Sequence, residues 1–323
     1  MAEMNIFRYL FERDKKPTKG LLALEWVVMG YLVLTLLLML FTYTKVYNPE
    51  SMLWGRFRVV AMTVAQWAVY RMLPCRFTRL CRVALQVALL SWWYPDTYEL
   101  NRVFPNLDHR FAALEQHIFG SQPALWFADR CSHPVFSELM HMGYASYYPL
   151  MVIVLLYYFF YRYADFGRAA FVVLASFFAY YVIFVLLPVA GPQFYYQAVG
   201  LDDIARGVFP DLGHYFASHQ ECLPIPGWRD GFFYHLVVIA HDAGERPTAA
   251  FPSSHVGVTT VLMLLAWHSR SRRLFFGMLP FFLLMCFATV YIQAHYAIDA
   301  LAGLVTGVII YFLLRYIYIF FRD

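Results

Sequence analysis

The sequence predicts an all-α fold, a polytopic transmembrane helical bundle with long outward loops. Of the 323 residues, 61% are hydrophobic and only 14% are charged, whereas soluble domains carry about 25% charged residues. Several apolar runs also reach about 20 residues, the length that crosses a hydrocarbon core of about 30 Å as a helix. This composition excludes a soluble enzyme, and the net charge of +4 therefore does not indicate nucleic-acid binding.

Eight hydrophobic segments can be placed along the chain, and six of them are predicted to be core spans. The other two, 57–73 and 80–94, are weak, because Arg58 interrupts the first and the second is shorter than a full span. They form either a re-entrant or interfacial pair, or two further membrane helices that raise the total to eight. The six core segments are 21–44, 139–161, 169–189, 254–268, 274–294 and 296–320.

The basic residues predict the orientation of the bundle. Lys and Arg are enriched in cytoplasmic loops, and 16 of the 25 fall in one set of loops and ends. We therefore expect both termini to be cytoplasmic and the loops 95–138 and 190–253 to face outward. The lack of an Asn-x-Ser/Thr sequon slightly favours a bacterial inner membrane over a eukaryotic lumen. The 16 residues are Arg8, Arg13, Lys15, Lys16, Lys19, Arg71, Arg76, Arg79, Arg82, Arg162, Arg168, Arg270, Arg272, Arg273, Arg315 and Arg322.

The remaining polar and aromatic residues leave some alternatives open. Cys131 and Cys222 both fall in outward loops, where they form a disulfide if the compartment is oxidising or otherwise remain two thiols. The loop histidines lack compact metal-ligand spacing, so neither a metal nor a cofactor is predicted. The stretches Tyr144–Tyr148 and Tyr195–Tyr196 are interpreted as interfacial belts. Glu25, within the first segment, has no evident partner.

Two short strings carry candidate chemistry, Phe251–His255 (FPSSH) and His295–Asp299 (HYAID). The first places a histidine in the opening turn of a helix. The second places a histidine and a carboxylate at i and i+4, on one helix face. A histidine nucleophile oriented by a carboxylate, together with a second histidine that protonates the leaving group, can perform phosphoryl transfer through a phosphohistidine.

Chain length brings these strings to one membrane face. From His255 the chain crosses about 30 Å of membrane, turns and returns to the same face at His295. The turn Gly191-Pro192-Gln193 follows the hydrophobic segment 169–189 on that face. Helix N-termini bind anions, and the Ser253 and Ser254 hydroxyls are expected to cap the helix, to contact a phosphate, or both. Asp299 is expected to accept the Nδ1–H of His295.

These strings resemble the signature motifs of the phosphatidic acid phosphatase type 2 superfamily. With GPQFYY at 191–196, the set is most similar to the branch that contains the inositol phosphorylceramide synthases, over about 139–312. The resemblance implies that His295 is the nucleophile, Asp299 its orienting partner and His255 the general acid, with no metal. It also implies that the phosphate is lined by Ser253, Ser254, Gly191, Pro192 and Gln193.

Four regions follow from the topology and the motifs. They are a basic cytoplasmic leader (1–20), N-terminal membrane segments (21–94), an outward loop with an interfacial helix around Phe111–Phe119 (95–138), and a catalytic membrane domain that includes the outward loop 190–253 (139–320).

The chain departs from the phosphatase pattern at its cationic positions. The 191–193 turn has no Lys or Arg, and Ala288 and Thr289 stand where the phosphatases have a Ser-Arg pair. Transferred phosphate needs positive charge, and the nearest candidate is Arg246, with Arg229 behind it; a solvated loop charge is the alternative for Arg246. The loss favours a singly charged phosphodiester substrate. We therefore predict a transferase with a phospholipid donor and a lipid hydroxyl such as ceramide as acceptor. The alternatives are a phosphatase, with water as acceptor, and a non-enzymatic transporter or scaffold.

Overall fold

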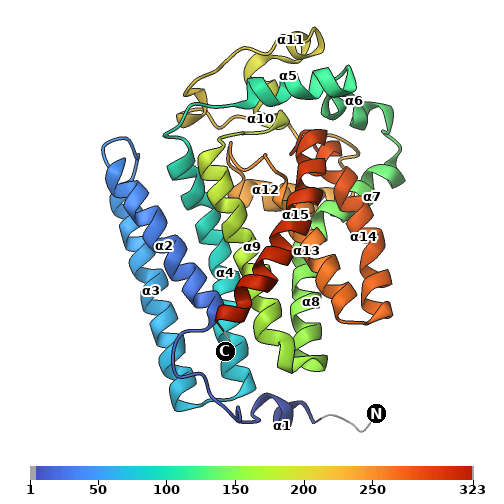
Figure 1. The fold of residues 1–323 in the computed structure, drawn as a ribbon. Coiled ribbons are helices and arrows are strands. Elements are labelled where there is room, and N and C mark those ends of the chain that lie inside the picture. The colour runs from blue at the N-terminus through green and yellow to red at the C-terminus, as the bar shows by residue number, and fades with distance from the viewer. Residues whose placement is uncertain (1–4, 322–323) are drawn as a thin grey trace.

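The structure, a computed structural model, describes residues 5–321 and is all-α. Fifteen α-helices and no β-strand occur in that part of the chain. Nine helices form a bundle, and shorter ones cover its upper end (Figure 1). The bundle contains α2 (Ala23–Phe41), α3 (Pro49–Met72), α4 (Arg76–Asn101), α7 (Pro134–Ala145), α8 (Tyr147–Tyr161), α9 (Tyr163–Leu186), α13 (Ser254–His268), α14 (Arg272–Tyr291) and α15 (Ala297–Ile317).

The two long outward loops of the prediction contain most of the short helices. The amphipathic stretch at 111–119 lies in α5, as the pattern indicated. In Figure 1, α5, α6, α10 and α11 cover the upper end, whereas α1 and the C-terminal part of α15 lie at the lower end. The short elements are α1 (Ile6–Leu10), α5 (Asp108–Phe119), α6 (Pro123–Arg130), α10 (Pro192–Val199), α11 (Leu201–Ala205), η1 (Tyr215–Ala217), α12 (Phe232–Gly244) and η2 (Tyr318–Phe320).

Four helices in the described chain are long and apolar enough to cross a membrane, namely α2, α9, α14 and α15 with η2. The expected span 139–161 is instead part of a pair, α7 and α8, bent by 48°. Pro149 explains the bend, because its ring clashes with the carbonyl four residues earlier and it donates no hydrogen bond. The expected span 254–268 is α13, which has only 15 residues, or about 22 Å. By length and composition the six predicted core spans are thus four, or five with the bent pair.

The two weak segments form long helices rather than a short re-entrant pair. α3 has 24 residues and α4 has 26, and they run beside α2 along the bundle (Figure 1). Their polar residues are paired in the interior. Arg56 bonds both carboxylate oxygens of Asp96, at 2.8 and 2.9 Å. Arg82 bonds Glu25 of α2, with Nε–Oε1 at 2.8 Å, which identifies the partner of Glu25.

Close backbone packing between α13 and α15 positions the two motif strings. A Cβ at Gly303 would lie 2.5 Å from the Ser253 carbonyl oxygen, and one at Gly307 would lie 2.6 Å from that of Gly257. Small residues at a helix interface allow the backbones to approach this closely. The N-terminal turns of α13 and α15 therefore lie together at the upper end of the bundle.

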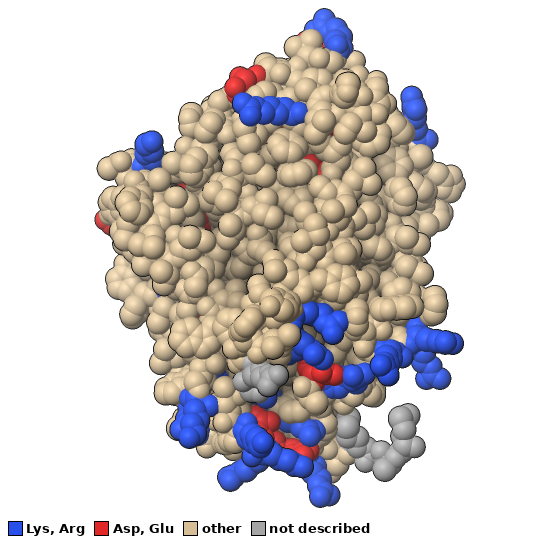
Figure 2. Space-filling model, viewed as in Figure 1, with Lys and Arg blue, Asp and Glu red and all other residues tan. Residues whose placement is uncertain are grey.

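The predicted basic residues gather at one end of the molecule. Figure 2 shows Lys and Arg side chains concentrated at the lower end, where the turns between α3 and α4, α8 and α9, and α13 and α14 lie. The motif histidines lie at the opposite end. Which end faces the cytoplasm stays a prediction from the charge distribution.

Candidate active site

The structure brings His255 and His295 together. Their ring centroids lie 5.7 Å apart, with an angle of 66° between the ring planes. His255 is the second residue of α13, and His295 lies in the short loop between α14 and α15. The two side chains thus come from separate elements that meet at the upper end of the bundle.

Backbone hydrogen bonds join three loops around this pair. The Ser253 N–H donates to the Asp299 carbonyl at 3.0 Å, and the Ala250 N–H donates to the Val189 carbonyl at 3.0 Å. The Gln193 N–H donates to the Gln293 carbonyl at 2.9 Å. These hydrogen bonds hold together three segments, 188–193, 249–254 and 292–299. Their convergence agrees with the prediction from chain length.

A backbone carbonyl, rather than Asp299, orients His295. The Nδ1 of His295 lies 2.7 Å from the Ala250 carbonyl oxygen and 3.7 Å from Asp299 Oδ2, which is too long for a hydrogen bond. Because a carbonyl only accepts, Nδ1 carries the proton and Nε2 keeps its lone pair. The expected His295–Asp299 hydrogen bond is therefore wrong, although the tautomer it was expected to fix is the one present.

Asp299 instead accepts a hydrogen bond from the backbone at the start of α15. His295 precedes α15, and Asp299 is the third residue of that helix, so the two do not share a helix face as predicted. Asp299 Oδ2 accepts the Tyr296 N–H at 2.8 Å, and Oδ1 is buried without a hydrogen-bond partner. Asp299 thus fixes the loop that carries His295 and keeps a carboxylate near the ring.

His295 is neutral at physiological pH. Burial lowers the pKa of His295 to about 4, although the Ala250 carbonyl and the Glu245 carboxylate act to raise it. A histidine that stays unprotonated retains a nucleophilic nitrogen. Burial, tautomer and pKa together leave Nε2 unprotonated, with its lone pair free.

Two tyrosines enclose His255. Tyr144 stacks on the His255 ring at 4.5 Å and Tyr147 packs on it at 4.4 Å. The Nδ1 of His255 is buried and has no hydrogen-bond partner. The interpretation of Tyr144–Tyr148 as an interfacial belt is therefore wrong for the two residues that wall the site. Tyr195–Tyr196 is also buried rather than interfacial.

The Gly191-Pro192-Gln193 turn has no free backbone N–H group to offer a phosphate, and its expected place in the phosphate lining stays a prediction. The N–H groups of Ala190 and Gly191 donate to Asp108 at 2.6 and 2.9 Å, Pro192 has none, and Gln193 donates to Gln293. Asp108 also accepts from the Tyr296 hydroxyl at 3.0 Å. Sequence reasoning missed Asp108, because nothing local links it to residues 80 to 190 positions away.

The start of α13 does offer free donors. Ser253 is its N-cap and accepts the Val256 N–H through Oγ at 3.4 Å, as predicted for a capping serine. The N–H groups of Ser254 and His255 have no hydrogen-bond acceptor in the described chain. Such groups, with the helix dipole, favour an anion beside His255.

Neither candidate cation contacts the histidines. The Arg246 guanidinium donates to the Glu245 carbonyl at 2.7 Å and interacts electrostatically with Glu99, and Arg229 is exposed. The charged side chain that does act on His295 is the Glu245 carboxylate, which accepts from the Tyr94 hydroxyl at 3.0 Å. Burial raises the pKa of Glu245. In the sequence, Glu245 stood out only as the neighbour of the candidate cation Arg246.

The sequence model of the PAP2 superfamily matches residues 109–313, which is more than half of the chain. The chain belongs to the PAP2 superfamily. No curated protein and no solved structure matches it. The superfamily match supports lipid-phosphate chemistry of the phosphatase or phosphotransferase type. The match begins 30 residues before the resemblance recognised in the sequence, and it includes α5.

Helix α5 contributes an acid to this PAP2 site. Glu115 Oε2 accepts the Ile298 N–H at 3.1 Å. A side chain of α5, which covers the upper end of the bundle, thus provides an acceptor for an N–H group in the first turn of α15. The side chain is buried, and burial raises the pKa of Glu115 to about 8. The nearby Asp299 carboxylate raises it further, whereas the N–H groups of Ile298 and Ala297 lower it.

We expect the Glu115→Gln substitution to flatten the pH dependence of stability. The folded-state pKa of about 8 exceeds the ordinary value of 4.5, so the stability linked to this group is complete below about 4.5 and is lost as the pH rises through about 8. Glutamine resembles the protonated acid, so the melting temperature in micelles, variant minus wild type, should increase from pH 5 to 9. Exposed Glu221→Gln serves as the control. A Glu115→Gln difference that is constant with pH would contradict the assignment.

The cysteines are unpaired in this PAP2 protein. Cys131 and Cys222 are free thiols, which is the second of the two alternatives left open by the sequence. Cys222 Sγ lies 3.7 Å from His241 Nε2. Within residues 5–321, no group of three or more His, Cys, Asp and Glu side chains has an arrangement that could hold a metal ion.

Proposed function

We propose that this PAP2 protein is an integral membrane lipid phosphotransferase. It moves a phosphorylated head group of the inositol-phosphate type from a phospholipid to a lipid hydroxyl such as that of ceramide. The observation that carries the proposal is the His255–His295 pair, in which Nε2 of a neutral His295 is free and no Lys or Arg of residues 5–321 contacts either ring. The same residues that resemble the inositol phosphorylceramide synthase branch form this pair.

The chemistry divides into two half-reactions. His295 Nε2 attacks phosphorus, so that a P–N bond forms and the P–O bond to the lipid alcohol breaks, while His255 gives that oxygen a proton. His255 must first take up this proton, because burial and the neighbouring His295 lower its pKa to about 3. Neutral His255 then takes the proton of the acceptor hydroxyl, whose oxygen attacks phosphorus and breaks the P–N bond. The cation that develops on His295 is stabilised by Asp299, 3.7 Å away, and the N–H groups of Ser254 and His255 contact the phosphoryl oxygens.

The charges around the pair favour a phosphodiester. A phosphomonoester carries nearly two negative charges and a diester carries one, so a site in which no Lys or Arg of residues 5–321 contacts either histidine ring accommodates the diester more readily. Glu245 and the Tyr94 hydroxyl, which are 3.0 Å apart, also provide acceptors and a donor for a polyhydroxylated head group. Arg246 remains a proposed phosphate contact that would require movement away from the Glu245 carbonyl.

A lipid phosphate phosphatase is the second candidate. The superfamily match supports phosphatase as well as phosphotransferase chemistry, and both use the same first half-reaction. In a phosphatase, water replaces the lipid hydroxyl as the acceptor. The identity of the acceptor therefore separates the two functions.

The test incubates the purified protein in mixed micelles with a phosphoinositide, labelled with ³²P in its head group, and ceramide. We expect label to appear in a new phosphosphingolipid, in an amount that depends on ceramide. A matched reaction with O-methylated ceramide, which lacks the accepting hydroxyl, should give no such product. Inositol phosphate or free phosphate as the sole labelled product would contradict transfer and support hydrolysis. No labelled product, with the donor unchanged, would contradict both.

A further inference from the structure

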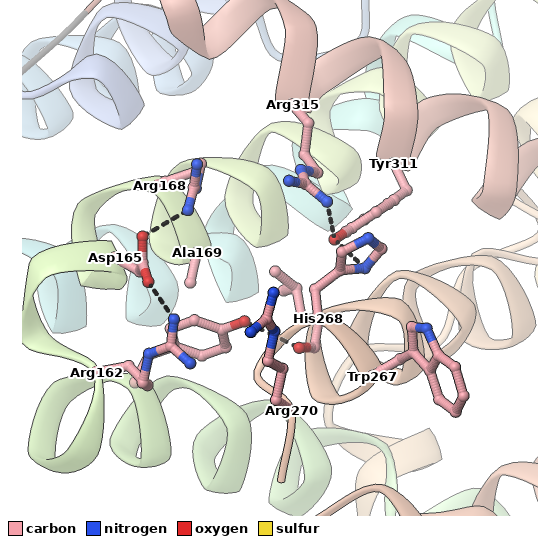
Figure 3. Close-up of a pocket in the computed structure, with 11 residues that line it drawn as sticks. Arg162, Asp165, Arg168, Ala169, Trp267, His268, Arg270, Tyr311 and Arg315 are labelled. Atoms are coloured by element: carbon pink, nitrogen blue, oxygen red, sulfur yellow. Dashed lines mark hydrogen bonds and ion pairs between the residues drawn. The ribbon is translucent and has the colours of Figure 1, made fainter.

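A cavity lies at the end of the bundle opposite the histidines, and the proposed mechanism does not use it. Its volume is about 540 Å³. Figure 3 shows arginine side chains from several elements directed toward one region, beside His268 and Tyr311. The cavity is lined by Tyr158, Arg162, Asp165, Arg168, Ala169, Leu265, Trp267, His268, Arg270, Tyr311 and Arg315. We refer to it as the basic pocket.

The basic pocket is separate from the active site. It lies where α8 meets α9, where α13 ends and along the last turns of α15. His255 begins α13 and His268 ends it, so the two ends of the helix are about 20 Å apart. A ligand in the basic pocket would therefore not contact the catalytic pair.

The basic pocket has an excess of positive charge. Among the described residues, four arginines and one carboxylate line it. That carboxylate, Asp165, is shared between Arg162 at 2.9 Å and Arg168 at 2.5 Å. Arg315 donates to the Tyr311 hydroxyl at 3.2 Å, which is neutral. Converging guanidinium groups repel one another unless an anion lies between them, and planar guanidinium groups suit phosphate oxygens.

An apolar groove continues from the basic pocket along the start of α14. It has a volume of about 510 Å³ and shares Trp267 and Arg270 with the pocket. Phe275 and Phe276 form much of its wall. Trp267 is 63% exposed and Phe276 is 60% exposed, so these rings are open to an outside molecule. Tryptophan and arginine together are typical of the membrane–water interface.

We propose that the basic pocket binds the phosphate group of an anionic phospholipid whose acyl chain lies in the adjoining groove. The guanidinium groups hold the phosphate oxygens, and Asp165 keeps Arg162 and Arg168 directed into the cavity. Basic pockets between membrane helices bind anionic head groups in this way. The pocket alone would also suit a soluble phosphate, but the apolar groove that opens from it favours the lipid.

The test measures lipid retention by native mass spectrometry in detergent, with dioctanoyl phosphatidylglycerol as the probe. The wild type should retain one equivalent that Arg168→Gln/Arg270→Gln binds about 10- to 30-fold more weakly, because two cationic contacts are lost. The control Arg71→Gln/Arg273→Gln removes two exposed arginines that do not line the basic pocket and should bind like the wild type. Dioctanoyl phosphatidylcholine should bind weakly, because its cationic head meets the arginines.

Two outcomes would overturn the proposal. The first is equal loss of affinity in both double variants, which would mean that any surface charge serves. The second is displacement of the lipid by glycerol phosphate at a concentration equal to that of the lipid, which would assign the basic pocket to a soluble phosphate. Thermal unfolding in detergent shows whether the variants are folded. If the double variant is not, Arg270→Gln and Arg273→Gln form the matched single pair, since both side chains are exposed.

Discussion

Replacing His295 with Ala is expected to abolish turnover of the lipid substrate, with a fall in kcat of at least about 10⁴-fold. The substitution removes the only nitrogen that the geometry presents as a nucleophile, since Nδ1 is bound to the Ala250 carbonyl and the imidazole is neutral because burial lowers its pKa to about 4. No neighbouring side chain takes over, because the nearest basic nitrogen belongs to His255, which is needed as the acid. A phosphohistidine route therefore fails at its first step.

The measurement is acid-free quenching of the ³²P-labelled reaction, followed by detection of protein-bound label. Wild type should show acid-labile label, and His295→Ala should show none. His235→Ala, an exposed histidine of α12, is the matched control and should be labelled fully. Retention of turnover by His295→Ala would contradict the assignment of His295 as the nucleophile. A further check is the pH dependence of labelling by a p-nitrophenyl phosphodiester, whose leaving group needs no acid. Its rate should fall below about pH 4, because His295 becomes protonated there.

The sequence predicted the chemistry-bearing residues better than their partners. His255 and His295 were placed on one face by helix length alone, since a span of fixed rise must return the chain to the face it left. Ser253 as an N-cap followed from the local preference of serine at helix starts. Both arguments use residues near one another in the chain, and both agree with the structure.

The groups that contact the two histidines and the Gly191 turn were not predicted, because they come from distant segments of the chain. The Ala250 carbonyl that orients His295 is a backbone group and has no residue signature. Asp108 occupies the donors of the Gly191 turn from α5, and Tyr144 reaches His255 from α7. No periodicity or motif links these positions. The sequence had instead suggested Asp299 as the partner of His295, a phosphate as the partner of the Gly191 turn, and an interfacial position for Tyr144.

The segments 57–73 and 80–94 show what composition does not reveal about a helix. Their charged residues were counted against a membrane helix, and α3 and α4 are not among the helices of the described chain that are apolar enough to cross a membrane. Arg56 nevertheless pairs with Asp96 and Arg82 with Glu25 in the interior, and each pair offsets part of the cost of burying a charge. At α13 the predicted bounds, 254–268, agree with the structure, but its 15 residues are fewer than a full span needs.

Replacing His255 with Gln is expected to separate the two half-reactions. Turnover of the lipid substrate should fall by about 10²- to 10⁴-fold, because the leaving alkoxide then departs without a proton. With a p-nitrophenyl phosphodiester the leaving group departs as a stable anion and needs no acid. The first half-reaction should therefore remain, and His295 should still be labelled. The second half-reaction should be slow, since the acceptor hydroxyl has lost its base.

The expected signature of His255→Gln is thus a burst of p-nitrophenol of up to one equivalent per active site, followed by little further release. The wild type should release it continuously, and His295→Ala should give neither burst nor turnover. His235→Gln controls for loss of an imidazole elsewhere on the same face. Equal loss with both leaving groups would contradict the acid role and would instead assign His255 to binding or to support of the Tyr144 and Tyr147 rings. The burst needs only the nucleophile, whereas later turnover needs both histidines. The comparison therefore tests the separate roles, nucleophile and general acid or base, that are proposed for the two rings 5.7 Å apart.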